Sequence, residues 1–379
     1  MISKILSILQ SSFSLFQSSG FLFITPGMVL MWGIGLLLLY LAISKQYEPL
    51  LLLPIGFGII VANLPLADLM HPGEGLIWKF YHYGIQWEII PPVIFLGLGA
   101  LTDFGPLLAN PSLIFLGAGA QVGVYLTFFA AYGMGFSLNE AASIGIIGGA
   151  DGPTTIFLAA KLAPHMLGTC AVAAYSYMAM VPIIQPPIMK LLTTKKERLI
   201  RMKKGRKVNK LEKLLFPIIA TFVIILLIPA AAPLIAMFML GNLFRESKVV
   251  ERLRLTSGNE LMNIVTIFLG VSVGATMNAE LFLKKEVIFI FVFGLFAFML
   301  STASGVLLAK FMNLFLKNKI NPLLGAAGVS AVPMAARVVH KMGEAEDKKN
   351  YLLMYAMGPN VAGVIGTVIA AGVFLTFLK

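Results

Sequence analysis

The sequence predicts an all-α integral membrane protein with about eleven transmembrane segments. We expect two inverted five-helix repeats, with two discontinuous helices that cross at the membrane midplane. Three observations support this prediction: the 379 residues are 58% hydrophobic and 12% charged, apolar runs of spanning length recur along the chain, and one motif occurs in both halves. Soluble domains carry about 25% charged residues, roughly twice the fraction found here.

Eleven apolar runs approach the roughly 20 residues that a helix needs to cross a bilayer. They lie near residues 28–44, 50–66, 89–108, 111–135, 141–162, 168–192, 214–243, 261–279, 287–310, 321–340 and 350–378. The chain starts with alternating apolar and Ser/Gln residues, which favour an interfacial helix over a signal peptide. This helix and one extra span form an N-terminal segment over residues 1–49.

Basic residues concentrate in one predicted loop, residues 193–213. Ten of the 29 Lys and Arg residues lie between Lys195 and Lys213. Cytoplasmic loops carry an excess of such residues, so we expect this loop on the cytoplasmic side of a multi-pass cell-membrane protein. Alternating the other spans then puts residues 245–254, RESKVVERLR, outside despite their charge. The net charge of +12 reflects this topology and does not indicate nucleic-acid binding.

An internal repeat relates the two halves of the chain. GIIGGADGP (145–153) aligns with GAAGVSAVP (325–333) at an offset of 180, and Tyr175 and Tyr355 keep the same offset. A fixed offset over separated positions indicates two copies of one structural unit.

We therefore predict a first repeat over residues 50–192 and a second over residues 214–379. Each copy has five crossings by this count. An odd number of crossings inverts the second copy relative to the first, as in many ion-coupled transporters.

The fourth element of each repeat contains Gly and Pro in mid-span. These residues break the helix and free backbone carbonyls and amides, which is tolerated only where protein or a water-filled cavity satisfies them. Two broken helices in corresponding positions point to a binding site at the midplane. We expect their turns to bring Asp151 close to Asn321 and Ser330.

Asp151 fits two roles. It precedes Gly-Pro-Thr-Thr, which is a good signal for a helix N-cap. However, a carboxylate in mid-membrane costs several kcal/mol unless it is compensated, which favours a cation or proton site. Sodium is a hard cation that binds carboxylate, carbonyl, amide and hydroxyl oxygens. The turns around Asp151 and around residues 321–330 provide all of these.

Three further polar residues leave alternatives open. Arg337 either extends its side chain to the membrane surface or binds an anion bidentately in a cytoplasmic cavity. Tyr177 and Asn360 lie in the fifth elements of the two halves, where spacing alone favours packing roles. The residues themselves predict a sodium or proton transporter with an anion contact that faces the cytoplasm.

Three motifs carry a family resemblance: GGADGPT around Asp151, NPLLGAAGVSAVPMAAR (321–337), and GPNVAG around Asn360. In these motifs, and over essentially the whole chain, the sequence resembles the β subunit of the sodium-translocating, biotin-dependent decarboxylases. That family acts on oxaloacetate, methylmalonyl-CoA, glutaconyl-CoA or malonate. The resemblance implies a subunit that decarboxylates carboxybiotin and couples this step to sodium export, with one proton consumed.

The resemblance also implies roles for individual residues. Asp151 would be the essential carboxylate of the sodium site, and Tyr177 a hydroxyl in the sodium or proton path. Arg337 matches the arginine expected to contact carboxybiotin. The other sodium-site positions match the second broken element and its neighbour: Asn321, Gly325, Ser330 and Asn360.

The implied partners are a carboxyltransferase and biotin-carrier subunit of the α type, a small membrane subunit of the γ or δ type, and further copies of this chain. No tightly bound organic cofactor and no nucleic acid are expected. One alternative is a stand-alone sodium/proton antiporter, which needs neither biotin nor Arg337. A second is a membrane anchor that only docks soluble subunits, which leaves Asp151 in mid-membrane unexplained.

Overall fold

The computed structural model describes residues 18–282 and 284–378. Within these residues the chain forms helices and turns and no strand, which confirms the predicted all-α architecture. The interfacial helix predicted at the N-terminus falls largely on residues 1–17 and lies outside the described residues.

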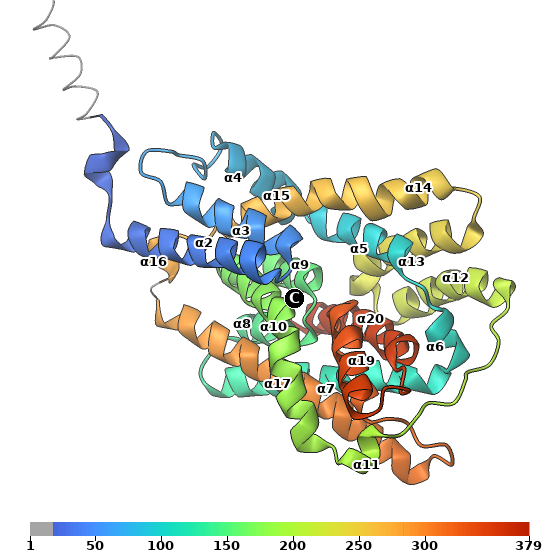
Figure 1. The fold of residues 1–379 in the computed structure, drawn as a ribbon. Helices are drawn as coiled ribbons and strands as arrows, with labels where there is room; N and C mark the ends of the chain where they lie inside the picture. Colours follow the sequence, from blue (N-terminus) through green and yellow to red (C-terminus); the bar gives the residue numbers. More distant parts are fainter. Residues whose placement is uncertain (1–17, 283, 379) are drawn as a thin grey trace, which may run out of the picture.

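The helices follow one another as shown in Figure 1. The first half contains η1 (Gly20–Phe23), α2 (Pro26–Lys45), α3 (Pro49–Ala62), α4 (Leu76–Phe80), η2 (Tyr81–Gln86), α5 (Ile90–Leu101), α6 (Gly105–Ala109), η3 (Pro111–Leu113), α7 (Ile114–Gly133), α8 (Leu138–Gly145), η4 (Ile146–Gly149), α9 (Gly152–Leu162), η5 (Pro164–Met166) and α10 (Leu167–Leu192). The second half contains α11 (Lys195–Arg198), α12 (Lys210–Leu227), η6 (Pro229–Ala231), α13 (Ala232–Ser247), α14 (Glu251–Thr256), η7 (Ser257–Leu261), α15 (Met262–Ala275), α16 (Ala279–Phe282), α17 (Lys285–Phe315), α18 (Leu323–Ala326), α19 (Met334–Glu346) and α20 (Leu353–Phe377).

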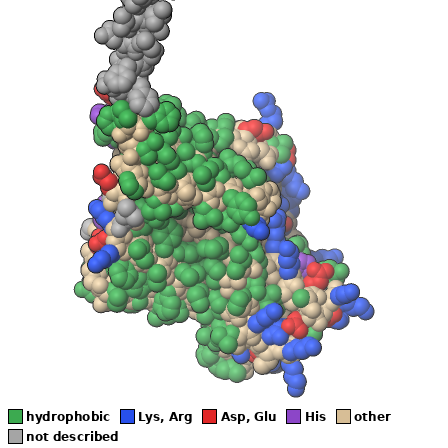
Figure 2. Space-filling model, turned by 60° about the vertical axis from the view of Figure 1, so that its left-hand side comes forward, with side chains coloured by type: hydrophobic (Ala, Val, Ile, Leu, Met, Phe, Trp, Pro, Cys, Tyr) green, Lys and Arg blue, Asp and Glu red, His purple; other side chains and the backbone are tan. Residues whose placement is uncertain are grey.

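Six helical stretches among the described residues are long and apolar enough to cross a membrane. They are Pro26–Lys45, Pro111–Gly133, Pro164–Leu192, Glu251–Ala275, Lys285–Phe315 and Leu353–Phe377. A seventh candidate is the pair Leu76–Gln86 and Ile90–Leu101, which is bent by 67°. Figure 2 shows a broad hydrophobic surface with Lys and Arg side chains gathered along one margin, as expected for a protein embedded in a bilayer. The structure thus supports a helical membrane protein, with six or seven spans by length and composition.

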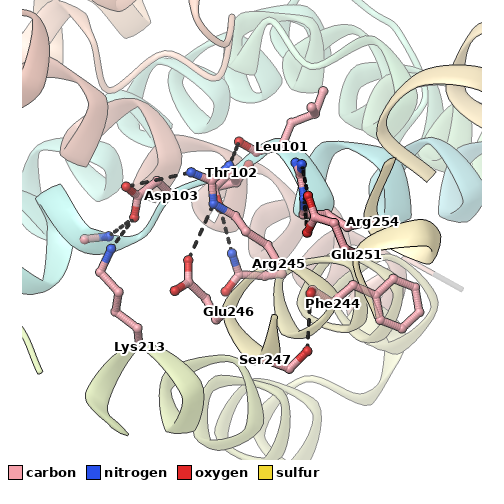
Figure 3. A network of polar contacts seen from close by, with 12 residues as sticks. Leu101, Thr102, Asp103, Lys213, Phe244, Arg245, Glu246, Ser247, Glu251 and Arg254 are labelled. Atoms are coloured by element: carbon pink, nitrogen blue, oxygen red, sulfur yellow. Dashed lines mark hydrogen bonds and ion pairs between the residues drawn. The ribbon is translucent and has the colours of Figure 1, made fainter. Parts of the chain in front are cut away.

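One predicted span, residues 214–243, is instead a hairpin of two helices. α12 and α13 pack side by side and are joined by η6. The start of α12 and the end of α13 both contact the Asp103 carboxylate. Lys213 Nζ lies 2.9 Å from Asp103 Oδ1, and Arg245 Nη2 lies 3.9 Å from Asp103 Oδ2 (Figure 3). Residues 245–254 therefore lie at the same end of the molecule as the start of α12, and the prediction that they lie on the opposite side from the basic loop is wrong. The apolar run continues through the turn, so hydropathy does not reveal it.

The two broken elements are also hairpins, each with both ends at one end of the molecule. His165, which follows α9, lies 2.9 Å from Glu140 in α8. Asn321, which precedes α18, donates to the carbonyl of Arg198 at 2.9 Å, and the Arg198 guanidinium lies 2.7 Å from Glu346 at the end of α19. Each element therefore doubles back, and the prediction that these two segments cross the membrane is wrong. Gly and Pro correctly predict the break, but they do not predict the direction in which the chain leaves it.

Helices from the two halves pack on one another reciprocally. α3 packs on α15 and α5 on α13, while α7 and α17 pack together and contact α20 and α10 respectively. Close approach depends on glycine. A Cβ at Gly241 of α13 would lie 2.0 Å from the carbonyl oxygen of Leu96 in α5, and one at Gly274 of α15 would lie 2.1 Å from that of Ile55 in α3. Small residues allow membrane helices to approach in this way.

Cysteine accessibility tests the hairpin of α12 and α13. We expect single cysteines at positions Lys203 and Lys248 to react with a membrane-impermeant thiol reagent from one side, and a cysteine at position His165 from the other. The reason is that α10 separates His165 from the basic loop. Native Cys170 is fully buried and gives little background. Labelling in vesicles of both orientations measures the sidedness, and a cysteine at 248 that reacts together with one at 165 would contradict the hairpin.

Candidate functional site

The tips of the two broken hairpins meet at Asp151. Its Oδ1 accepts the backbone N–H of Thr154 at 3.1 Å, which caps α9, and its Oδ2 accepts the hydroxyl of Ser330 at 3.1 Å. The backbone N–H of Ser330 also donates to the carbonyl of Gly149 at 2.9 Å. The structure therefore brings Asp151 and Ser330 together, as the sequence predicts. One carboxylate oxygen serves as the N-cap and the other joins the two hairpins.

The local sequence accounts for the shape of the first tip. Ala150 has a left-handed φ of 50° and ends η4. Pro153 lies in the first turn of α9, where its missing N–H has no intrahelical partner to lose. Gly152 lies against the ring of Tyr175, because a Cβ there would lie 2.0 Å from Tyr175 Cε1. The glycine thus lets the tip pack directly on α10.

Asp151 is buried, with 4% of its surface exposed. In the described part of the chain its carboxylate has hydrogen-bond donors but no ion pair with a cationic side chain. A buried carboxylate without a counter-charge is strongly unfavourable. Either a proton or a bound cation must therefore neutralise it.

A cavity of about 150 Å³ lies beside Asp151. Its polar lining consists of Glu48, Thr102, Asp151, Tyr175, Asn263, Thr266 and Ser330. Thr102 precedes Asp103, which pairs with Lys213 next to the basic loop. The cavity therefore extends from the hairpin tips towards the end that carries the basic loop.

Three buried oxygens near the tips lack a hydrogen-bond partner within the described residues: the Tyr175 hydroxyl, Thr154 Oγ1 and Asn360 Oδ1. Tyr175 lines the cavity beside Asp151. The amide nitrogen of Asn360 donates to two carbonyls of the second tip, at 3.0 and 2.7 Å. Since buried polar atoms are normally paired, these oxygens and the carboxylate resemble an incomplete ligand set. Their chemistry fits a hard cation such as sodium.

Asn321 lies away from this oxygen cluster. Its side-chain amide donates to the carbonyls of Arg198 and Ile200 in the basic loop, at 2.9 and 2.8 Å. The structure therefore does not bring Asn321 to Asp151, and their predicted proximity is wrong. The physical reason is the hairpin, because Asn321 lies at its base and Ser330 at its tip.

Gly325 and Tyr177 both contact α17. A Cβ at Gly325 would lie 2.0 Å from the carbonyl oxygen of Gly305, and the Tyr177 hydroxyl donates to the carbonyl of Phe291. Neither residue lines the Asp151 cavity. The tyrosine hydroxyl in that cavity belongs to Tyr175, which the sequence singled out only through its place in the internal repeat.

Arg337 lies on α19, the returning arm of the second hairpin. Its side chain is exposed, and its guanidinium makes no hydrogen bond or ion pair within the described residues. Burial raises the pKa of the Glu48 carboxyl, and the positive charge of Arg337 partly opposes this shift. Because Glu48 lines the cavity, Arg337 lies near the part of the cavity that Glu48 lines. A free guanidinium at this position is suited to bind a carboxylate.

Comparison with known proteins identifies the family. The family described as Na+-transporting oxaloacetate decarboxylase beta subunit matches residues 27–378. The chain belongs to this family. It is therefore a membrane subunit of a sodium-transporting decarboxylase, as the resemblance in its motifs implies.

Three relatives illustrate how closely this decarboxylase subunit follows its family. Methylmalonyl-CoA decarboxylase subunit beta of Veillonella parvula is 57% identical, over 97% of this chain and 97% of its own length. The subunit of the same name in Propionigenium modestum is 54% identical, over 97% and 99%. Glutaconyl-CoA decarboxylase subunit beta of Acidaminococcus fermentans is 54% identical, over 96% and 97%.

Replacing Gly152 tests the packing of the first tip. We expect Gly152→Ala to lower the free energy of unfolding by about 1–3 kcal/mol, the usual cost of overpacking a filled core, because the new methyl overlaps the Tyr175 ring. Gly33→Ala is the matched control, since a Cβ at Gly33 has no neighbour within 4 Å. Thermal unfolding in detergent compares the two variants, and equal midpoints would contradict the tight contact.

Proposed function

We propose that this subunit decarboxylates carboxybiotin presented by a partner and uses the free energy to export sodium, with one proton consumed. The observation that carries the proposal is the buried Asp151 carboxylate at the junction of two hairpin tips, surrounded by unpartnered oxygens. Such an arrangement is stable only when a proton or a cation neutralises the carboxylate. Proton and sodium binding at one carboxylate therefore exclude each other, which is the basis of coupling.

The proposed sodium ligands are Asp151, Ser330 and Asn360, joined by the Tyr175 hydroxyl and Thr154 Oγ1. All five are oxygen donors, which suits a hard cation. The contacts of Asn321 and Gly325 support a different role, since they hold the second hairpin against the basic loop and α17.

Carboxybiotin is proposed to enter from the end that carries the basic loop and to place its carboxylate at Arg337. The C–N bond to the ureido nitrogen then breaks, CO2 leaves, and the nitrogen takes up one proton, so that biotin is regenerated. A drier pocket favours this step because the carboxylate loses its hydration. We assign the proton to Asp151, through the hydroxyl of Tyr175, when sodium displaces it from the carboxylate.

We further propose that the chain consists of two inverted units, α2–α10 and α12–α20. Each unit would have five crossings (α2, α3, α5, α7 and α10; α12, α13, α15, α17 and α20) and one re-entrant hairpin, with the two hairpins entering from opposite sides. The reciprocal helix packing and the sequence offset support this arrangement. This arrangement assigns α2 to the first unit, whereas the sequence predicts that it belongs to a separate segment, 1–49, ahead of a first repeat over residues 50–192.

In this topology the basic loop is cytoplasmic and the protein spans the cell membrane. The cavity then opens Asp151 towards the cytoplasm, so the structure corresponds to the inward-facing state. Outward release works against the membrane potential at about 2.3 kcal/mol per charge per 100 mV. Decarboxylation must therefore change which side the site faces, by moving one unit against the other.

The acid that supplies the carboxyl group is selected by a partner. The names of the relatives suggest an acyl-CoA such as methylmalonyl-CoA or glutaconyl-CoA, or oxaloacetate. The proposed partners are a carboxyltransferase with its biotin carrier and a small γ- or δ-type membrane subunit, in a complex that contains several copies of this chain. Family membership argues against a stand-alone antiporter, which needs no carrier.

Removing the carboxylate tests the central proposal. We expect Asp151→Asn to lower carboxybiotin decarboxylation by at least about a hundredfold, the lower bound for loss of a proton-transfer group, and to remove its sodium dependence. Turnover and sodium uptake in vesicles of the reconstituted complex measure both effects. Arg337→Lys is the contrasting variant, which keeps the charge but loses the planar fork. Arg337→Lys should raise the KM for carboxybiotin and keep the sodium response. Sodium-stimulated turnover in the Asp151 variant would exclude a role for the Asp151 carboxylate in sodium coupling.

The two tyrosines are distinguished by their hydroxyls. We expect Tyr175→Phe to raise the half-saturating sodium concentration by about threefold to tenfold, because one oxygen ligand worth about one hydrogen bond is lost. Tyr177→Phe removes a hydroxyl that donates to α17, so it should lower the turnover rate and leave sodium affinity near its original value. Sodium titration of decarboxylation in both variants measures this difference. If Tyr177→Phe weakened sodium affinity and Tyr175→Phe did not, Tyr177 rather than Tyr175 would be the sodium ligand.

A further inference from the structure

A second hollow lies at the end of the molecule that carries the basic loop. We call it the basic cleft; it measures about 830 Å³ and lies between the start of α12, the end of α13, and α14. Its lining residues are Val208, Lys210, Lys213, Arg245, Glu246, Lys248, Glu251 and Arg254. The proposed decarboxylation mechanism uses none of them.

Three cations of the basic cleft already have carboxylate partners (Figure 3). Lys213 and Arg245 share Asp103, at 2.9 and 3.9 Å, and Arg254 lies 2.5 Å from Glu251. Burial acts to raise the pKa of Asp103, but hydrogen bonds from Lys213 and the Gly105 backbone, with the nearby positive charges, hold it below its ordinary value. This carboxylate is therefore ionised at neutral pH and keeps its two cations in place.

The remaining two cations have no direct carboxylate partner, although Lys248 lies close enough to Glu251 for its charge to lower the pKa of that carboxyl. Lys210 and Lys248 are exposed and make no hydrogen bond or ion pair within the described residues. Five cations line the cleft against two carboxylates, and Asp103 behind the lining adds a third. The cleft thus keeps a surplus of positive charge at two lysines, one at the start of α12 and one directly after α13.

An apolar stripe starts at the basic cleft and runs along α12. Its residues recur every three or four positions, so they share one helix face, and they are between 40% and 79% exposed. They are Leu211, Leu215, Ile219, Phe222 and Leu226. Consecutive helix residues point about 100° apart, so the stripe lies around the helix from Lys210. Leu214 and Ile218, which follow Lys210 at the fourth and eighth positions, are half-buried and exposed and lie between the lysine and the stripe. A positive cleft is therefore continuous with an exposed hydrocarbon-like surface.

We propose that the basic cleft binds the headgroup of an anionic glycerophospholipid, with the phosphate between Lys210 and Lys248 and an acyl chain along the α12 stripe. Basic pockets between helices at the cytoplasmic surface of membrane proteins suit such headgroups. A free phosphate would use the two lysines but not the stripe. The inference rests on the geometry of the cleft and is independent of the sodium site. Bound lipid would hold α12, α13 and the end of α5 together, since all three meet at Asp103.

Thermal unfolding of the delipidated complex in a neutral detergent tests this proposal. We expect phosphatidylglycerol to raise the unfolding midpoint, and neither phosphatidylcholine nor inorganic phosphate at the same concentrations to do so. In the double variant Lys210→Gln/Lys248→Gln, the phosphatidylglycerol concentration that gives half of the stabilisation should rise by about fivefold for each lysine charge removed. This is the usual contribution of one basic side chain to binding an anionic lipid surface. The charge-retaining variant Lys210→Arg/Lys248→Arg should keep the original response.

The matched control is Lys195→Gln/Lys196→Gln, which removes the same charge from exposed positions of the basic loop and should leave the half-effect concentration unchanged. An unaltered response in the cleft variant, or an equal loss in the control, would overturn the proposal. Equal stabilisation by phosphatidylcholine would mean that apolar contact alone is sufficient. Equal stabilisation by inorganic phosphate would identify a free-anion site. Either result would also overturn the lipid assignment.

Discussion

The carboxylate of Asp151 is held between two hairpin tips that come from opposite halves of the chain. It caps α9 with one oxygen and accepts the Ser330 hydroxyl with the other. Because the carboxylate is buried without a cationic partner among the described residues, a proton or a cation has to bind to it and balance its charge. The glycines around it allow the tips to approach α7, α10, α17 and α20 closely enough for this contact to form.

The placement of the carboxylate links chemistry to movement. In the proposed arrangement of two inverted units, Asp151 lies where the units meet, so movement of one unit against the other would change the side from which the site is accessible. The cavity beside Asp151 extends past Thr102 towards the end that carries the basic loop. In the proposed mechanism the substrate anion and the transported cation approach from the same end, which would allow decarboxylation to respond to occupancy of the sodium site.

That end of the molecule is also where its charge is organised. The Arg198 guanidinium holds Glu346, its carbonyl accepts from Asn321, and a second cluster around Asp103 joins α5, α12 and α13. The first set of contacts holds the base of the second hairpin against the loop that follows α10, and the second holds α12 and α13 against the end of α5. The basic loop thus has a structural role, because it contacts both ends of the second hairpin.

The sequence by itself determined the class of protein, the family and the central contact, because these depend on composition and on short motifs. A chain with so few charges has to be embedded in lipid, and the repeat that contains Asp151 and Ser330 predicts that they meet. Only the tertiary structure decided that the two broken segments double back, that residues 214–243 form two helices, and that Tyr175 rather than Tyr177 lines the cavity. Hydropathy reports how apolar a run is, but the direction of the chain after a Gly or Pro break depends on contacts with helices far away in the sequence. For the same reason, an unpartnered hydroxyl or a cavity becomes visible only when all of its neighbours are in place.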